Sequence, residues 1–334
     1  MSKPKTDYDP FGECAPTIAH APVQVLGGRF QFTANSRHLL QLVDRAYGGL
    51  PKHRLSADLP RFNVRLVLTN GGNSPYRGEP PVLRTVAGAG LICGTIDAAS
   101  FAILSPTSRS GIIAISRELL RFPYHARYEL LEFAVFTLAA RAQQLVSLHA
   151  ACVGHRGQGL LLMGPSGAGK STIALQCLLH GLDFVSEDST FVSPNRLLAT
   201  GVANYVHVRP DSLRFLDNCV ETAWIRKSPR IRRRSGVEKL EIDLRRAAWR
   251  LARMPLRTKS IVFLAKRSHE RGPLLLPILS SDAHARLEAC QPYAVRQEGW
   301  KSFIRKWPRL TFWELRRGRH PSEAASALQR LLST

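Results

Sequence analysis

A glycine-rich stretch places the strongest constraint on this chain. Residues 164–172 read Gly-Pro-Ser-Gly-Ala-Gly-Lys-Ser-Thr, which matches the pattern G-x-x-x-x-G-K-[ST]. The glycines let the backbone curl so that successive N–H groups point inward, and a following helix would add its positive N-terminal end. The sequence therefore predicts a P-loop that binds the phosphates of a nucleoside triphosphate.

The flanking segments supply the context that this motif requires, a buried strand before it and a helix after it. Residues 160–163 form a continuous apolar run, and residues 171–180 carry apolar positions at helical spacing before Gly181. Lys170 is then predicted to reach the β- and γ-phosphates and the Ser171 hydroxyl to ligate Mg²⁺. The predicted nucleotide-binding residues are Gly164, Pro165, Ser166, Gly167, Ala168, Gly169, Lys170, Ser171 and Thr172.

The composition is that of a soluble globular protein with an unusual charge. The chain has 334 residues, 44% of them hydrophobic, which predicts two domains or one large core with an N-terminal extension. Its 47 Lys and Arg residues against 25 Asp and Glu residues give a net charge of +22. This balance favours an acidic partner, namely nucleic acid, an anionic membrane surface or an acidic protein, unless the basic residues are spread over a solvated surface.

The cysteines and the apolar runs exclude several classes of protein. The six cysteines are scattered without a C-x-x-C pair, so they predict neither a disulfide framework nor a metal site. Residues 1–10 lack the apolar core of a secretory signal, and the apolar run 130–140 is too short and too charged to cross a bilayer. We expect a cytoplasmic protein without a membrane span.

Residues 1–125 are predicted to form an α+β domain without a catalytic motif. A hairpin with a turn at Gly27-Gly28 precedes a helix that starts after Ser36 and ends at Gly48-Gly49. Later runs are short and spaced as in an antiparallel meander. The predicted strands are 22–26, 29–33, 62–68, 91–96, 101–104 and 111–115. A role in substrate recognition or in forming a homo-oligomer is the working hypothesis for this part.

Residues 126–334 are predicted to form the nucleotide-binding part. A helix over 127–144 leads into a β-hairpin whose second strand enters the P-loop. After the P-loop helix, an apolar strand runs into Glu187 and Asp188 and then resumes over 189–192. Carboxylates at this point suit Mg²⁺ binding and a base for phosphoryl transfer. The alternative is a charged turn between two strands.

The spacing of three features is similar to that of a known family. His149 lies 21 positions before Lys170, and the adjacent acids Glu187 and Asp188 lie 17 and 18 positions after it. This arrangement resembles the catalytic domain of the HPr kinase/phosphorylase family and its kinase-like relatives, whose α/β fold is similar to phosphoenolpyruvate carboxykinase. The resemblance is specific over residues 149–192 and weaker to about residue 287, and it does not extend to residues 1–125.

The resemblance implies roles for these residues. Lys170 and the loop amides would hold the ATP phosphates, Ser171 would ligate Mg²⁺, and the acid pair would act as general base and metal ligand with His149 in support. It does not decide which of Glu187 and Asp188 is the base. For His149, a core histidine bonded to the backbone is the alternative.

The chain departs from the family at two places. The family usually has two aspartates where this chain has Glu187-Asp188, and the longer glutamate moves the carboxylate by about 1 Å or more. The family's downstream glycine-rich signature is replaced by residues 232–239. The identity of the acceptor and a reverse phosphorylase activity therefore stay open, and relatives that phosphorylate serine on other substrates, such as precursor peptides, match equally well.

Two basic segments follow the acids. Residues 226–234 hold six basic residues, and such a loop would clamp a nucleotide or an acidic substrate, or would only be solvated. Residues 297–319 interleave aromatic and basic residues, which predicts a packed amphipathic helix with a basic outer face or a nucleic-acid surface. We also expect strands at 206–208 and 260–265 and a last helix over 321–332.

The sequence as a whole predicts an ATP- and Mg²⁺-dependent kinase acting on a serine hydroxyl of a protein or peptide, an acidic substrate being compatible with the charge. A small-molecule kinase with the same site is one alternative. A non-kinase P-loop ATPase or nucleic-acid-binding protein is the other. The chain has neither an N-K-x-D motif nor an acid-tipped second strand, which argues against GTPases and translocases. Nucleic acid is the less favoured partner.

Overall fold

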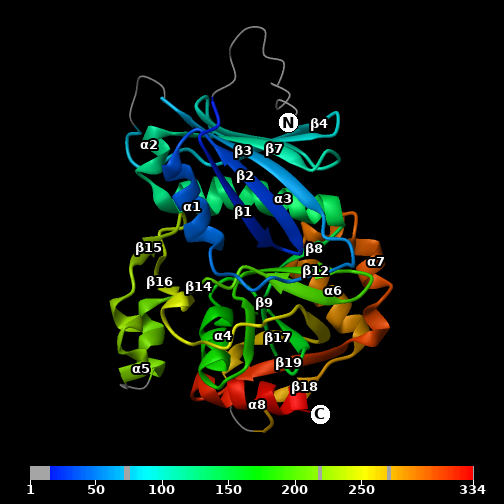
Figure 1. The fold of residues 1–334 in the computed structure, drawn as a ribbon. Helices are drawn as coiled ribbons and strands as arrows, with labels where there is room; N and C mark the ends of the chain where they lie inside the picture. Colours follow the sequence, from blue (N-terminus) through cyan, green and yellow to red (C-terminus); the bar gives the residue numbers. More distant parts are fainter. Residues whose placement is uncertain (1–15, 71–75, 217–219, 269–271, 334) are drawn as a thin grey trace. The chain divides into compact units, whose positions relative to one another are not determined.

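The computed structural model describes residues 16–70, 76–216, 220–268 and 272–333. It is a mixed α/β structure (Figure 1). The chain divides into two compact units. The first unit comprises Met1–Val23, Phe30–Ala46 and Phe62–Val135, and the second comprises Gln24–Arg29, Tyr47–Arg61 and Phe136–Thr334.

The first unit is built on a seven-stranded sheet in the order β1-β2-β3-β7-β6-β5-β4. Its strands are β1 (Ala19–Val25), β2 (Gly28–Ala34), β3 (Arg61–Thr69), β4 (Arg84–Gly88), β5 (Leu91–Asp97), β6 (Ser100–Ser105) and β7 (Ser110–Ser116). Strands β5 to β7 form the antiparallel meander expected from the sequence, β4 extends it by pairing with β5, and β3 pairs with β7 in parallel. Alternation buries one side of β2 and β3, where the rings of Phe30 and Phe62 stack at 4.4 Å.

Two details of this sheet differ from the sequence prediction. The turn between β1 and β2 is Leu26-Gly27, with φ of 49° and 74°, and Gly28 already belongs to β2. A glycine pair marks such turns because it accepts positive φ easily, but here a leucine takes the first position. Strand β4 was not predicted, because all its residues are exposed and it has no apolar alternation.

Two of the helical segments in this part of the chain begin close to predicted positions. The segments are α1 (Arg37–Tyr47), α2 (Arg117–Leu120), the π-helix η1 (His125–Leu131) and α3 (Glu132–Gln143). The short α2 was not predicted. The helix predicted over 127–144 corresponds to η1 followed directly by α3. Its first part has the wider π geometry.

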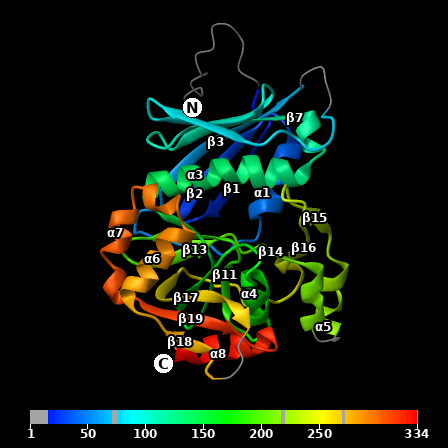
Figure 2. The ribbon, with the colours of Figure 1, turned by 180° about the vertical axis from the view of Figure 1, so that it is seen from behind.

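The second unit contains a nine-stranded sheet with the main order β11-β9-β10-β17-β13-β12-β8. Its strands are β8 (Val146–His149), β9 (Ala151–His155), β10 (Gln158–Met163), β11 (Asp183–Ser186), β12 (Ser189–Ser193), β13 (Leu198–Gly201), β17 (Leu256–Ser268), β18 (Leu275–Pro277) and β19 (Thr311–Arg317). The predicted hairpin is present as β9 and β10, and β10 pairs with β17 in parallel. Strand β17 also lies beside β19, as both views show (Figures 1 and 2).

Smaller elements complete the second unit. A three-stranded sheet has the order β14-β16-β15, made of β14 (Tyr205–Val208), β15 (Arg230–Arg232) and β16 (Glu238–Asp243). The helices are α4 (Lys170–Leu179), α5 (Val220–Ala223), α6 (Ser280–Cys290), α7 (Trp300–Ile304) and α8 (Pro321–Ser333). Short 3₁₀ turns include η2 (Pro210–Phe215), η3 (Ile225–Lys227), η5 (Ala294–Arg296) and η6 (Trp307–Arg309). The predicted last helix is α8, which packs against α4.

The prediction of an amphipathic helix within residues 297–319 is wrong. The segment contains only the short α7 and η6 and then enters strand β19. Its rings at Trp300, Phe303, Trp307 and Phe312 are buried, and Trp307 stacks on Phe312 at 4.3 Å. The aromatic residues are core residues, so these four rings are not available for stacking on nucleic-acid bases.

Among the helices within the described residues, none combines the length and the apolar character that crossing a membrane requires.

Candidate functional site

The glycine-rich loop lies between β10 and α4, as the motif requires. Gly167 and Gly169 have φ of 79° and 102°, in the region that favours glycine, and Gly169 is the residue before the helix. The Ala168 N–H donates to the Pro165 carbonyl at 3.1 Å, which closes the turn. The backbone thus enters α4 with the amides of the first turn directed toward the loop.

Lys170 is buried in this loop with 6% of its surface exposed. Its ammonium donates to the carbonyl oxygens of Gly164 at 2.7 Å and Pro165 at 3.3 Å. Burial lowers the pKa of Lys170, while the negative charges of Asp188 and Glu187 act in the opposite direction. The bonds of the ammonium group are thus to the loop backbone, and the charges of the acid pair act on it without a direct bond among the described residues.

The remaining loop residues differ in accessibility. Pro165, Ser166 and Gly167 are exposed, and Ser171 is half-buried at the start of α4. The Thr172 hydroxyl lies 2.9 Å from that of Ser212 in η2. A Cβ atom on Gly167 would lie 3.6 Å from the guanidinium of Arg209, so this arginine, which belongs to no recognised motif, lies beside the loop.

His149 and Asp188 come together through the pairing of two strands. His149 ends β8 and is paired with Ser189, the first residue of β12. Its Nδ1 lies 2.8 Å from Oδ1 of Asp188. The ring is 38% exposed and bonds a carboxylate, so it is not a core histidine bonded to the backbone.

Arg233 holds the other side of Asp188. Its Nη1 and Nη2 both donate to Oδ2 at 3.3 Å. Burial opposes ionisation of Asp188, but the hydrogen bond from His149 and the charges of Arg233 and Lys239 outweigh it, so the pKa of Asp188 is lowered. The basic run 226–234 thereby contributes one side chain to the site.

Two glutamine side chains fix the free edge of β8. The His149 N–H donates to Oε1 of Gln291 at 2.8 Å, and Nε2 of Gln291 donates back to the His149 carbonyl at 3.1 Å. Gln297 makes the same pair of bonds with Ser147, at 2.7 and 3.2 Å. Gln291 is 1% exposed. The two amides act as ladder partners for β8, and no sequence motif marked them.

Glu187 lies in a different environment from its neighbour. It is 4% exposed, and its Oε1 lies 2.7 Å from Nδ1 of His207 and accepts the His207 backbone N–H at 3.1 Å. Burial disfavours the charged form of Glu187, but the bond and charge of His207 outweigh this and lower its pKa. Burial also opposes the charged form of His207, but bonds to Glu187 and to Glu241 on β16 raise its pKa. Glu187 and His207 therefore form an ion pair.

The side chains that could bind a metal ion at this site are the carboxylates of Glu187 and Asp188. Within the described residues, the structure contains no group of three or more His, Cys, Asp and Glu side chains placed to hold a metal ion. Mg²⁺ that arrives with a nucleotide needs only one or two carboxylates, because phosphate oxygens supply other ligands. The buried Oε2 of Glu187 has no hydrogen-bond partner among the described residues. Its free lone pairs fit such an ion.

Comparisons with known proteins find a similar solved structure and no matching sequence. The sequence matches no family model, and a search of curated proteins finds no match either. Among solved structures, the chain is similar to the Hpr(Ser) kinase/phosphatase from Coxiella burnetii, with a TM-score of 0.26 and 13% identity over 55% of this chain and 95% of that chain. A TM-score this low shows neither the family nor the function.

Proposed function

We propose that this protein is an ATP- and Mg²⁺-dependent kinase that transfers the γ-phosphoryl group to a serine hydroxyl of a protein or peptide. The observation that carries the proposal is the carboxylate of Asp188, held by His149 at 2.8 Å and Arg233 at 3.3 Å, in a chain whose Lys170 is bonded inside the glycine-rich loop. One site thus combines donors for phosphate with an ionised carboxylate for a hydroxyl. Phosphoryl transfer needs this combination.

The loop supplies the phosphate half of the site. The amides at the start of α4 point toward the loop, and the helix adds its positive end. Lys170 already lies inside the loop, so an incoming phosphate replaces the Gly164 and Pro165 carbonyls as its partner. Arg209, beside Gly167, adds a second positive charge on this side.

Asp188 suits the role of base better than Glu187. The side chain of Asp188 is 34% exposed, so an acceptor hydroxyl can reach it, whereas that of Glu187 is 5% exposed and bonded to His207. The lowered pKa of Asp188 keeps it ionised at neutral pH. It therefore accepts the hydroxyl hydrogen bond, orients the nucleophile and takes its proton late in a loose transition state.

The acid pair and Ser171 would hold the metal ion. When bound with ATP, Mg²⁺ would neutralise charge on the phosphates. Glu187 fits this role through its unpartnered Oε2, and Ser171 is half-buried beside Lys170. His149 positions Asp188 and does not itself need to contact the nucleotide.

The choice of a serine acceptor rests on the resemblance of residues 149–192 to the HPr kinase/phosphorylase family. We place the catalytic residues in a domain over 126–334 and assign recognition or oligomerisation to a domain over 1–125. A basic surrounding, with Arg209 and Arg233 at the site, suits an acidic protein or peptide.

Radiolabel transfer tests the proposal. The protein is incubated with Mg²⁺ and γ-labelled ATP in separate pools of proteins, peptides and metabolites. We expect label on serine in the protein or peptide pool, and a loss of at least about 100-fold in both Lys170→Ala and Asp188→Asn. Asp282→Asn makes the same change at an exposed acid of α6 and should keep full activity.

Three outcomes would overturn it. Near-normal transfer in both site variants would mean that the site lies elsewhere. Label found only in a metabolite would replace the protein or peptide acceptor by a small molecule. Label released only as inorganic phosphate would mean that the protein is an ATPase.

A further inference from the structure

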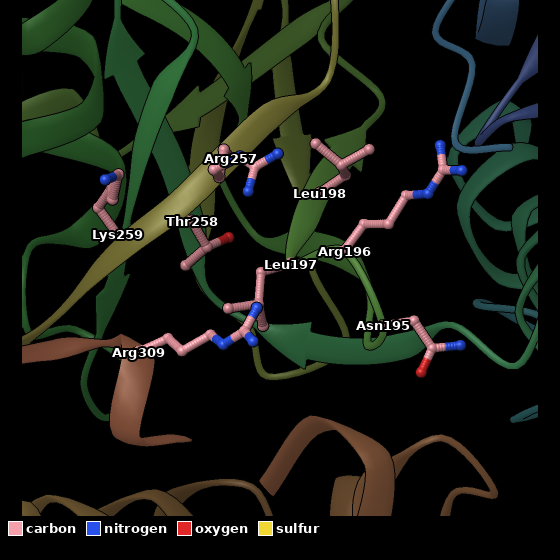
Figure 3. Close-up of a pocket in the computed structure, with 8 residues that line it drawn as sticks. All are labelled: Asn195, Arg196, Leu197, Leu198, Arg257, Thr258, Lys259 and Arg309. Carbon is pink, nitrogen blue, oxygen red and sulfur yellow. The ribbon is translucent and has the colours of Figure 1, made fainter. Parts of the chain in front are cut away.

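A cavity lies in the second unit, toward the opposite end of β17 from the glycine-rich loop. Its volume is about 440 Å³. It is lined by Asn195, Arg196, Leu197, Leu198, Arg257, Thr258, Lys259 and Arg309 (Figure 3). In the β10–β17 pairing, Arg257 is level with Gln158, whereas Phe263 is level with Met163 just before the loop. At a rise of about 3.3 Å per residue, Arg257 and Phe263 lie roughly 20 Å apart along β17.

The cavity is strongly basic. Arg196 comes from the turn between β12 and β13, Arg257 from β17 and Arg309 from η6, and Lys259 is a fourth cation in the lining. Figure 3 shows Arg309 directed toward Leu197 and the Arg257 guanidinium directed toward the side of Leu198, whereas Arg196 and Lys259 point away from them. Among the described residues, no carboxylate lines the cavity and these cations form no ion pair. Positive charges gathered without a counter-charge attract an anion.

A buried hydroxyl gives independent evidence for a ligand. Thr258 is 2% exposed, and its Oγ1 has no hydrogen-bond partner among the residues that the structure describes. Its backbone is satisfied, because the Thr258 N–H donates to the Leu197 carbonyl at 2.7 Å. Figure 3 shows the hydroxyl directed to the side on which Leu197 and Leu198 lie. A buried hydroxyl without a partner is costly, and an anionic oxygen in the cavity would accept its hydrogen.

We propose that this cavity, defined by Arg257, Arg309 and Thr258, binds a small organic anion with at least two negative charges, carried by phosphate or carboxylate groups. The volume is within the range of small-molecule sites, and Leu197 and Leu198 offer apolar contact to the organic part. The arginines and the hydroxyl hold the charged groups. The described lining offers no carboxylate base, so the role proposed for the cavity is binding.

Calorimetric titration of the full chain tests this site. Pyrophosphate and citrate serve as probes that separate phosphate from carboxylate chemistry. The site variants are the double variant Arg257→Ala with Arg309→Ala and the single variant Thr258→Val, which removes only the hydroxyl. Arg330→Ala removes one exposed arginine of α8 and is the matched control. Thermal unfolding confirms that each variant is folded.

At least one probe should bind the wild-type chain and lose about 100-fold in affinity in the double variant and about tenfold in Thr258→Val, with Arg330→Ala unchanged. Lys170→Ala should leave this binding intact, which separates it from the proposed kinase site. Equal affinity in the wild-type chain and the double variant would overturn the proposal. So would binding of a single-stranded oligonucleotide that the double variant loses while neither small probe binds.

Discussion

Nδ1 of His149 lies 2.8 Å from Oδ1 of Asp188, while Arg233 donates to the other carboxylate oxygen. Both oxygens are therefore fixed, and the carboxylate has one orientation. We expect His149→Ala to lower kcat for phosphoryl transfer by about 10- to 100-fold with little change in KM for ATP, because Asp188 loses its position. His149→Asn, whose amide nitrogen can replace Nδ1, should recover part of the rate.

Steady-state kinetics measures both constants. His180→Asn changes an exposed histidine of the same unit and serves as control. A raised KM for ATP with unchanged kcat would show that His149 contacts the nucleotide instead.

The paired glutamines allow catalysis and stability to be separated. Gln291→Leu and Gln297→Leu each remove two bonds to β8, from His149 and from Ser147. Each should lower the free energy of unfolding by about 1–3 kcal/mol, because backbone groups lose their partners. Only Gln291→Leu should also lower kcat in the folded protein. Urea denaturation and initial rates check this, and an equal loss of rate in both variants would contradict it.

Gly154 tests the close packing beneath the β9–β10 hairpin. A Cβ atom at this position would overlap the Gln158 backbone oxygen and lie 2.5 Å from the Leu256 side chain. Gly154→Ala should therefore lower the free energy of unfolding by about 1–3 kcal/mol. Gly88→Ala is the matched control, because a Cβ there would meet nothing within 4 Å and should change stability by less than about 0.5 kcal/mol. If Gly154→Ala and the wild-type chain had the same urea midpoint, this prediction would be contradicted.

His53 makes stability depend on pH. Its Nε2 donates to the Ala252 carbonyl at 2.8 Å, and its Nδ1 lies 2.8 Å from the Thr200 hydroxyl. Burial lowers the pKa of His53 below 6.5, against the weaker effect of the Ala252 bond. Below pH 6.5 the unfolded chain therefore binds the proton more readily than the folded chain, and the free energy of unfolding falls. Above that pH, this contribution is fully present.

The free energy of unfolding, measured between about pH 5 and about pH 8, checks this prediction. His53→Asn should flatten the acid side of the profile, and His180→Asn should leave it unchanged. The same slope in His53→Asn and in the wild-type chain would show that other groups cause the fall.

The parts of the fold that sequence predicted are those set by local pattern. The strand before residue 164, the helix after Gly169 and the strands on either side of Glu187 and Asp188 were all expected. Glycine spacing and apolar runs act within about ten residues, so a single segment contains the whole signal. The mixed α/β architecture follows from these elements.

Long-range packing decided the rest. Residues 311–317 form β19 because Phe312 and Leu315 are buried and the strand pairs with β17, a partner that their own pattern does not reveal. Arg209, Arg233 and Gln291 reach the site from separate segments and carry no motif. The different burial of Glu187 and Asp188 likewise depends on His207, which the sequence did not connect to them.

The pairing of His149 with Ser189 joins two strands that are separated in the chain by the hairpin, the glycine-rich loop and all of α4. Closing such a loop costs more chain entropy than forming the adjacent β9–β10 hairpin. During folding, we therefore expect the loop and its helix to form before Asp188 reaches His149. Recovery of catalysis after refolding would then lag behind recovery of helical structure, and enzymatic activity would report the last stage of sheet assembly.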